Sequence, residues 1–108
     1  MKRILLVCSA GMSTSLLVNK MKSAAKEKGI DAEIWSVSTN ALDENISKAD
    51  VVLIGPQIRF MLQKVKEKGA KYNVPVDAID PTDYGRCNGS NVLEKAIKMI
   101  DENKNNKI

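Results

Sequence analysis

Residues 4–15 read Ile4-Leu5-Leu6-Val7-Cys8-Ser9-Ala10-Gly11-Met12-Ser13-Thr14-Ser15. The four apolar residues at the start predict a buried β-strand, because such a run suits a strand that is covered on both faces. The small and hydroxyl-bearing residues after Cys8 predict a tight loop, and the stretch beyond them has the apolar spacing of a helix. A strand, a short loop and a helix in this order indicate the opening unit of an α/β fold.

The loop after this strand has the composition of an anion-binding site. In a strand–loop–helix unit, successive backbone N–H groups point into one concavity with the helix N-terminus behind it. These groups and the helix dipole favour the thiolate form of Cys8, and Gly11 lets the backbone approach a ligand closely. The hydroxyl groups of the loop equally suit helix N-caps, a role that does not conflict with phosphate binding. The sequence therefore predicts a nucleophilic Cys8 beside a phosphate-binding loop formed by Ser9, Ala10, Gly11, Met12, Ser13, Thr14 and Ser15.

Strand and helix patterns alternate along the rest of the chain. Apolar or alternating segments predict strands at residues 2–7, 31–37, 51–54 and 74–79. Helical spacing predicts helices at residues 13–28, 40–47, 57–68 and 90–102. Gly29 and Gly69 are expected to end the first and third of these helices. A loop is expected at 80–89 and a frayed tail at 103–108.

Four such strand–helix units predict a three-layer α/β sandwich. Its middle layer is a four-stranded parallel sheet, and helices cover both faces of the sheet. The all-apolar strands within residues 2–7 and 51–54 belong at the centre. Ligands of such sheets bind at the carboxyl ends of the strands, where Cys8 is expected to lie. With 108 residues and no linker, residues 1–108 are expected to form a single domain.

The composition argues against several classes of function. The net charge is +4, but the basic residues are spread over predicted helices and only four aromatic residues are present, which favours solvated helix faces over nucleic-acid binding. The chain has no histidine, which excludes a His–Cys dyad, a phosphohistidine on this chain and His-containing zinc sites. Any proton transfer must therefore use Asp, Glu, Tyr, Lys or a group of a partner.

The cellular location follows from three further features. No apolar run approaches the roughly 18 residues of a membrane span, and the N-terminus lacks the pattern of a signal peptide. Cys8 and Cys87 form no C-x-x-C pair, and both are expected to remain thiols in a reducing compartment. We therefore expect a cytoplasmic protein, and we expect Cys87 to be an inert thiol.

The spacing of Cys8, Thr14 and Ser15 resembles the phosphate loop of low-molecular-weight tyrosine phosphatases, which implies their fold. Those enzymes have an arginine at the position of Thr14, so a bidentate phosphate ligand is missing here. Asp80-Pro81 resembles their general-acid loop, although Asp-Pro is also a common turn opener. A phosphatase or an arsenate-reductase-like enzyme that uses the same cysteine loop is one alternative function.

A binding or signalling module without covalent chemistry, of the flavodoxin or receiver type, is a second alternative. Receivers need an acidic pair after the first strand and an aspartate that ends the third. Cys8-Ser9 and Gly55 occupy those places, and Asp50 precedes its strand. The sequence thus argues against a receiver, and a colourless purified protein would argue against a flavin module.

The segment from Cys8 to Leu17 more closely resembles the active-site loop of another family. This family is the IIB component of the lactose/cellobiose class of the bacterial phosphoenolpyruvate-dependent sugar phosphotransferase system. Residues 49–57, which end in Gly55-Pro56-Gln57, resemble the same family, as does Tyr84-Gly85 followed by Gly89. The similarity runs over almost the whole chain, and the cellobiose-type branch is the better match.

This resemblance implies a phosphocarrier. Cys8 would accept a phosphoryl group from a phosphohistidine of the IIA partner and pass it to a sugar held by the membrane IIC partner. The sugar expected from the family is a cellobiose-like β-diglucoside. Pro56, Gln57 and Tyr84 are expected to form a rim where partners dock, and Arg59 is expected either on this rim or merely exposed on its helix. The resemblance also implies that this chain needs neither a metal nor a cofactor, because the partners supply the leaving imidazole and the acceptor. A monomer suits a carrier that faces two partners in turn.

Overall fold

The computed structural model describes residues 1–8 and 12–105, without the side chains of residues 12–14 and 104–105. Within this part of the chain lies one four-stranded sheet, in the order β2-β1-β3-β4, and all neighbouring strands are parallel. The strands are β1 (Lys2–Cys8), β2 (Ala32–Ser38), β3 (Val51–Ile54) and β4 (Val76–Ala78). The two most apolar strands, β1 and β3, are therefore the central ones, as the sequence predicts.

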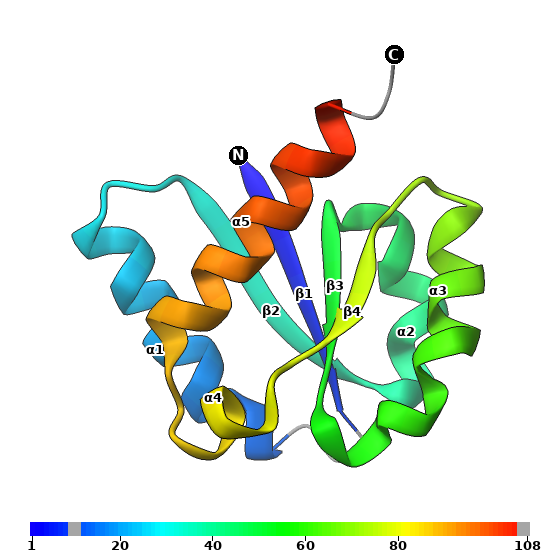
Figure 1. Ribbon diagram of the computed structural model, residues 1–108, viewed down its shortest axis with the longest axis horizontal. Coiled ribbons are helices and arrows are strands. Elements are labelled where there is room, and N and C mark those ends of the chain that lie inside the picture. The colour runs from blue at the N-terminus through cyan, green and yellow to red at the C-terminus, as the bar shows by residue number, and fades with distance from the viewer. Residues whose placement is uncertain (9–11, 106–108) are drawn as a thin grey trace.

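Helices cover both faces of this sheet (Figure 1). On one face, α1 (Met12–Glu27) and α5 (Gly89–Asn105) pack against each other. On the other face lie α2 (Leu42–Asn45) and α3 (Leu62–Ala70), and the short helix α4 (Pro81–Gly85) follows β4 at the carboxyl edge of the sheet. This arrangement confirms the predicted three-layer α/β sandwich.

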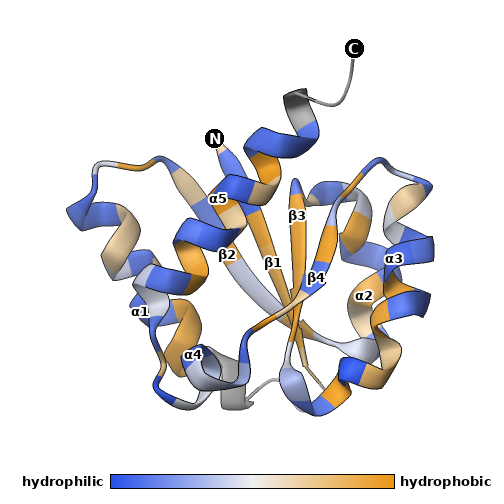
Figure 2. Cartoon of the chain, viewed as in Figure 1, coloured by the Kyte–Doolittle hydropathy of each residue, from blue (hydrophilic) through white to orange (hydrophobic). Residues whose placement is uncertain are grey.

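The apolar run of β1 is explained by the two layers that enclose it. Ile4 and Leu6 belong to the core between the sheet and α1 with α5, whereas Leu5 and Val7 belong to the core on the opposite face. All four side chains are fully buried. Alternate residues of β3 divide between the same two cores, and Figure 2 shows β3, and β1 beyond its first two residues, as hydrophobic.

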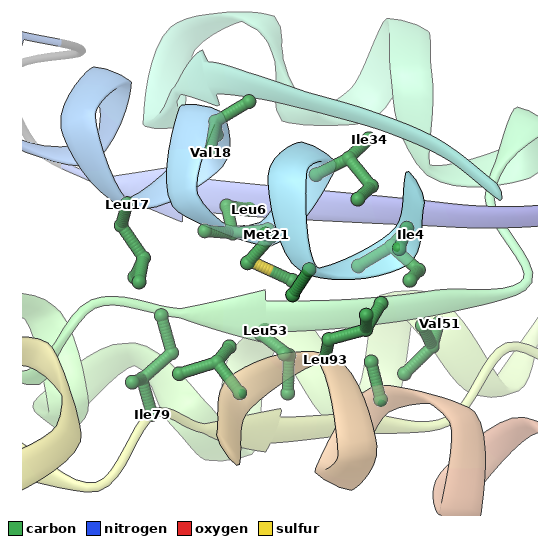
Figure 3. Packing of buried hydrophobic residues seen from close by; sticks show 14 of the residues in the cluster. Ile4, Leu6, Leu17, Val18, Met21, Ile34, Val51, Leu53, Ile79 and Leu93 are labelled. Atoms are coloured by element: carbon green, nitrogen blue, oxygen red, sulfur yellow. The ribbon is translucent and has the colours of Figure 1, made fainter. Parts of the chain in front are cut away.

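The predicted apolar stripe of α1 lies against the sheet. Leu17, Met21, Ala24 and Ala25 are all buried in the first core. Figure 3 shows Met21 beside Leu93 of α5 in the space between the helices and the sheet. Burying a side chain of this size contributes about 1.5–3 kcal/mol relative to leaving it exposed. This packing holds α1 at a fixed place on the sheet.

The prediction that α3 ends at Gly69 is wrong. Gly69 lies inside the helix, one residue before its last residue. A Cβ atom at this position would lie 2.6 Å from the carbonyl oxygen of Val74 and 2.7 Å from a methyl group of Val76. The glycine is therefore needed because α3 approaches β4 too closely for any side chain, and not because the helix stops there.

Residues 80–89, predicted as a loop, contain the five-residue helix α4. Asp80 is its N-cap and Pro81 its first helical residue, a combination that starts a helix even where the helix is short. The predicted tail is also shorter than expected, because α5 continues to Asn105. The side-chain amide of Asn103 donates a 3.0 Å hydrogen bond to the carbonyl of Asn73, which ties this last part of the helix to the body.

Three other predicted segments lie where the sequence predicts them, but their boundaries or their type of secondary structure differ. The predicted helix at 40–47 is a series of short turns, η1 (Thr39–Ala41), α2 and η2 (Ile46–Lys48). The predicted helix at 57–68 begins as a 3₁₀ segment, η3 (Pro56–Met61), before α3. Ile58 inside η3 has non-helical backbone angles, which breaks the α-helical hydrogen bonding. The fourth strand is three residues long and not six, because Pro75 precedes it and cannot donate to the ladder.

Candidate functional site

Cys8 is the last residue of β1 and lies at the carboxyl edge of the sheet. It pairs in register with Ser38, the last residue of β2, while Val7 pairs with Ile54, the last residue of β3. Its residue surface is 1% exposed. Three strands therefore end around this thiol, as the predicted position of the nucleophile requires.

Gly55 continues β3 beside Cys8. Its backbone N–H donates a 2.8 Å hydrogen bond to the carbonyl oxygen of Val7, so the ladder between β1 and β3 extends to the end of the sheet. A Cβ atom at residue 55 would lie 3.7 Å from the Cβ of Cys8 and 2.8 Å from the side-chain oxygen of Gln57. Gly55 therefore lies beside the cysteine, and the contact that a side chain there would disturb is the one with Gln57.

The N-terminus of α1 lies at the same edge, four residues after Cys8 (Figure 1). The first turn of this 16-residue helix contains no acidic residue, so no carboxylate there opposes an anion. Of the predicted phosphate loop, Ser9, Ala10 and Gly11 lie outside the described residues, as do the side chains of Met12, Ser13 and Thr14. Ser15 is exposed on α1.

Asp80 caps α4. Its Oδ1 accepts hydrogen bonds from the backbone N–H groups of Thr82 at 2.8 Å and Asp83 at 3.4 Å. The Asp80-Pro81 pair is therefore a helix start, which is the turn-opening interpretation of the sequence. A carboxylate that serves two backbone donors has a structural reason to be there without any acid–base chemistry.

The three predicted rim residues occupy two segments of the carboxyl edge. Pro56 and Gln57 begin η3; Pro56 is half-buried and Gln57 is exposed. Tyr84 lies in α4, and its half-buried side chain packs against the core that contains α1 and α5. Arg59 is exposed on η3. The structure thus gives Tyr84 a packing contact and leaves Gln57 accessible.

Sequence reasoning missed two exposed apolar residues near the same edge. Phe60, in η3, is 83% exposed, and Leu16, in the second turn of α1, is 54% exposed. Phe60 also lines a shallow groove of about 410 Å³ with Met61 and Lys64. Phe60 and Leu16 could have been found from the sequence, since both lie outside the apolar stripe of their helices. An apolar residue outside that stripe faces solvent or a partner.

Cys87 follows α4 and is half-buried. Its backbone has φ +51°, in the left-handed region, and its N–H donates to the carbonyl of Tyr84 at 3.1 Å. This geometry terminates the short helix. The position therefore has a structural explanation that does not involve the thiol.

The described residues contain neither a candidate metal-binding cluster nor a candidate membrane-spanning helix. Residues 1–8 and 12–105 contain no group of three or more His, Cys, Asp or Glu side chains able to hold a metal ion. Among the helices of that same part of the chain, none has both the length and the apolar character needed to cross a membrane.

The family model of the lactose/cellobiose-specific IIB subunit of the PTS system matches residues 3–95. An oligo-β-mannoside-specific EIIB component from Bacillus subtilis is 46% identical over 100 residues, which cover 93% of this chain and 97% of that protein. EIIB components from two Lactococcus lactis subspecies, one galactose-specific and one cellobiose-specific, are 45% and 44% identical with the same coverage. These matches extend through β1, the following loop, η3 and α4.

Solved structures give the same result. The solution structure of a cellobiose-specific phosphotransferase IIB component from Borrelia burgdorferi superimposes with a TM-score of 0.80, at 40% identity, and covers 94% of both chains. The lactose-specific IIB domain from Streptococcus pneumoniae has a TM-score of 0.83 over 91% of this chain and 96% of that chain. At 16% identity the second likeness concerns the fold alone.

IIB components are phosphotransferases of sugar uptake and work with IIA and IIC partners. The matches favour this function over the phosphatase alternative, and they confirm the family resemblance of the sequence. The chain belongs to the lactose/cellobiose-specific IIB family of the phosphoenolpyruvate-dependent sugar phosphotransferase system.

Proposed function

We propose that Cys8 is the residue that carries the phosphoryl group. The observation that carries this proposal is the position of Cys8, at the end of a central strand and four residues before the N-terminus of a 16-residue helix. A thiolate at such a place lies where helix dipole and backbone N–H groups favour negative charge. Residues 9–15 are the phosphate-binding segment, through their backbone N–H groups.

The proposed chemistry is two successive phosphoryl transfers. In the first, the Cys8 thiolate donates an electron pair to phosphorus and forms the P–S bond, while the P–N bond of the donor's phosphohistidine breaks and its electron pair stays on the imidazole. In the second, the oxygen of a sugar hydroxyl forms a P–O bond and its proton passes to a base of the membrane partner, while the P–S bond breaks and returns its electron pair to sulfur. Both steps conserve the phosphoryl group, and neither needs a cofactor on this chain.

The absence of two phosphatase features supports a carrier over a hydrolase. Thr14 stands where those enzymes have an arginine, so the bidentate ligand that stabilises their transition state is missing. Asp80, the only candidate for a general acid that the sequence offered, caps α4. A phosphocysteine without these groups is protected from water and persists until an acceptor arrives.

The partners approach the carboxyl edge of the sheet, because Cys8 must reach both of them. The donor is the phosphorylated IIA protein, and the acceptor is the sugar held by the membrane IIC protein. Pro56, Gln57 and Tyr84 form the docking rim, extended by the exposed Leu16 and Phe60. The protein acts as a monomeric single domain on the cytoplasmic side, where phosphoenolpyruvate supplies the phosphoryl group.

The proposed acceptor is a β-linked disaccharide of the cellobiose type. The cellobiose-specific names of the Lactococcus lactis relative and the Borrelia burgdorferi structure support this choice. The relatives named for oligo-β-mannoside and galactose have almost the same identity to this chain. A direct assay that compares several sugars therefore tests which one is the acceptor.

A reconstituted assay tests the function. The purified chain is combined with labelled phosphoenolpyruvate, the general phosphotransfer proteins, IIA, and vesicles that contain IIC, and cellobiose is compared with other disaccharides. The proposal predicts labelled sugar phosphate that depends on this chain. Release of free phosphate without sugar phosphate, together with turnover of an aryl phosphate, would instead support the phosphatase alternative.

A further inference from the structure

Gln57 and Cys8 both lie close to Gly55 at the carboxyl edge of the sheet. Their distances are measured from the position that a Cβ atom of residue 55 would occupy. The side-chain oxygen of Gln57 lies 2.8 Å from it and the Cβ of Cys8 lies 3.7 Å from it. The side chain of Gln57 therefore folds back over Gly55 toward the cysteine, although the two residues belong to different segments, η3 and β1.

The carboxamide of Gln57 has capacity to bind a ligand. Among the residues that the structure describes, none makes a hydrogen bond with this side chain, and Gln57 is exposed. A carboxamide carries two N–H donors and one acceptor oxygen, and rotation about the last side-chain bond turns either end toward a neighbour. The amide oxygen and the Cβ of Cys8 thus lie close to the same position beside Gly55, and the Gln57 side chain is exposed to solvent.

We propose that the carboxamide of Gln57 donates a hydrogen bond to a phosphoryl oxygen on Cys8, and so is a phosphate ligand outside the loop of residues 9–15. This inference rests on the proposed phosphorylation of Cys8. The hydrogen bond forms when phosphorus bonds to sulfur and is released when the group leaves, so no atom of Gln57 changes its covalent bonds. It assigns to Gln57 a contact with the transferred group itself, in addition to its place on the docking rim.

The chemistry of a neutral donor suits a carrier. An arginine would bind a phosphate dianion with two charge-assisted bonds, whereas a carboxamide offers a weaker, uncharged contact. A weaker contact stabilises the phosphocysteine enough to accept the group and still lets it pass on. Gln57 therefore supplies part of what an arginine at the position of Thr14 would supply, without holding the phosphate as tightly.

The lack of a side chain at Gly55 leaves room for the carboxamide of Gln57. A methyl group at residue 55 would meet the end of the Gln57 side chain, which is flexible and can move away, while its distances of 3.6 Å to the Val7 carbonyl and 3.7 Å to Cys8 are ordinary contacts. The backbone of Gly55 has φ −64°, which alanine adopts without strain. Gly55→Ala is therefore expected to fold normally and to displace the Gln57 amide.

The test measures the equilibrium between the phosphorylated IIA donor and this chain by intact mass, at a fixed ratio of the two proteins. Gln57→Leu should lower the equilibrium constant for phosphorylation about tenfold, since a hydrogen bond to a charged group is lost. Gln57→Glu should lower it further, because a carboxylate repels the phosphoryl oxygens. Gln63→Leu and Gln63→Glu make the same changes in the exposed groove beside Phe60. They should leave the equilibrium constant unchanged, because a change in docking alters the rates and not the equilibrium between the free proteins.

Two further measurements separate this role from a general effect on the site. Gly55→Ala should give about the same loss as Gln57→Leu, and the double variant should lose no more than either single variant, because both remove one contact. In a Cys87→Ser background, neutral iodoacetamide should alkylate unphosphorylated Cys8 at the same rate with and without the Gln57→Leu substitution, since the contact needs a phosphoryl oxygen.

The outcomes distinguish this inference from the function on which it rests. Equal equilibrium constants for wild type and Gln57→Leu, with Cys8 still phosphorylated, would overturn the role of Gln57 alone. Losses that add up in the Gly55→Ala, Gln57→Leu double variant, or slower alkylation in Gln57→Leu, would also overturn it. A wild-type chain that accepts no phosphoryl group from a competent donor would overturn both proposals.

Discussion

At the scale of single residues, the proposed phosphoryl transfer depends on where the thiol of Cys8 is placed. Cys8 ends a strand whose preceding four residues are completely buried, so the backbone under the thiol is fixed by two cores at once. The sequence predicted this position because the apolar run stops at the cysteine. It could not predict the approach of Gln57, since the direction of an exposed side chain depends on a neighbouring segment that is far away in the chain.

Asp80 offers a prediction at this scale. Asp80→Ala should lower the free energy of unfolding by about 1 kcal/mol, because the N-cap of α4 is lost, whereas Asp80→Asn should keep most of the stability since asparagine caps equally well. Chemical denaturation measures both variants. Neither substitution should slow the phosphorylation of Cys8, and a large loss of rate in Asp80→Asn at unchanged stability would show that the carboxylate has a chemical role after all.

At the scale of elements, strongly periodic segments were predicted well and short ones were not. The stripe of α1 and the apolar strands have enough buried residues to fix their structure from sequence alone. The helix α4 was missed because its five residues carry no apolar stripe, and only its Asp80-Pro81 start marks it. The role of Gly69 was misread because the sequence does not show how closely α3 approaches β4.

This close approach gives a prediction about the packing of α3 on β4. Gly69→Ala should lower the free energy of unfolding by about 1–3 kcal/mol, because the new methyl group meets backbone and a buried side chain that cannot easily move. Gly85→Ala is the control, since nothing lies within 4 Å of the corresponding position, and it should change stability by less than about 1 kcal/mol. Equal unfolding midpoints for the two variants would contradict this account of the α3–β4 contact.

At the scale of the whole molecule, exposed apolar residues are divided between the two edges of the sheet. Leu16 and Phe60 lie in segments that follow the carboxyl ends of β1 and β3. Met1 and Tyr72 lie before β1 and β4, at the opposite edge. If Cys8 carries the phosphoryl group as proposed, the partners must reach it, and of these two pairs the first is placed to contact them.

The division provides a matched pair of substitutions. Phe60→Ser should slow phosphorylation by IIA about tenfold at low donor concentration without lowering stability, because an exposed aromatic anchor of the interface is lost. Tyr72→Ser removes an exposed aromatic residue from the opposite edge and should leave the rate unchanged. The initial rate is followed by intact mass at several donor concentrations, and similar rates for both variants would argue against docking over Phe60.

The intact mass of the chain after incubation with phosphoenolpyruvate, the general phosphotransfer proteins and IIA shows directly whether Cys8 carries the phosphoryl group. We expect a gain of one phosphoryl group in the wild type and in Cys87→Ser, and no gain in a folded Cys8→Ser variant. A phosphoryl group retained in Cys8→Ser, or none in the wild type when the donor is competent, would contradict the assignment of Cys8 as the carrier.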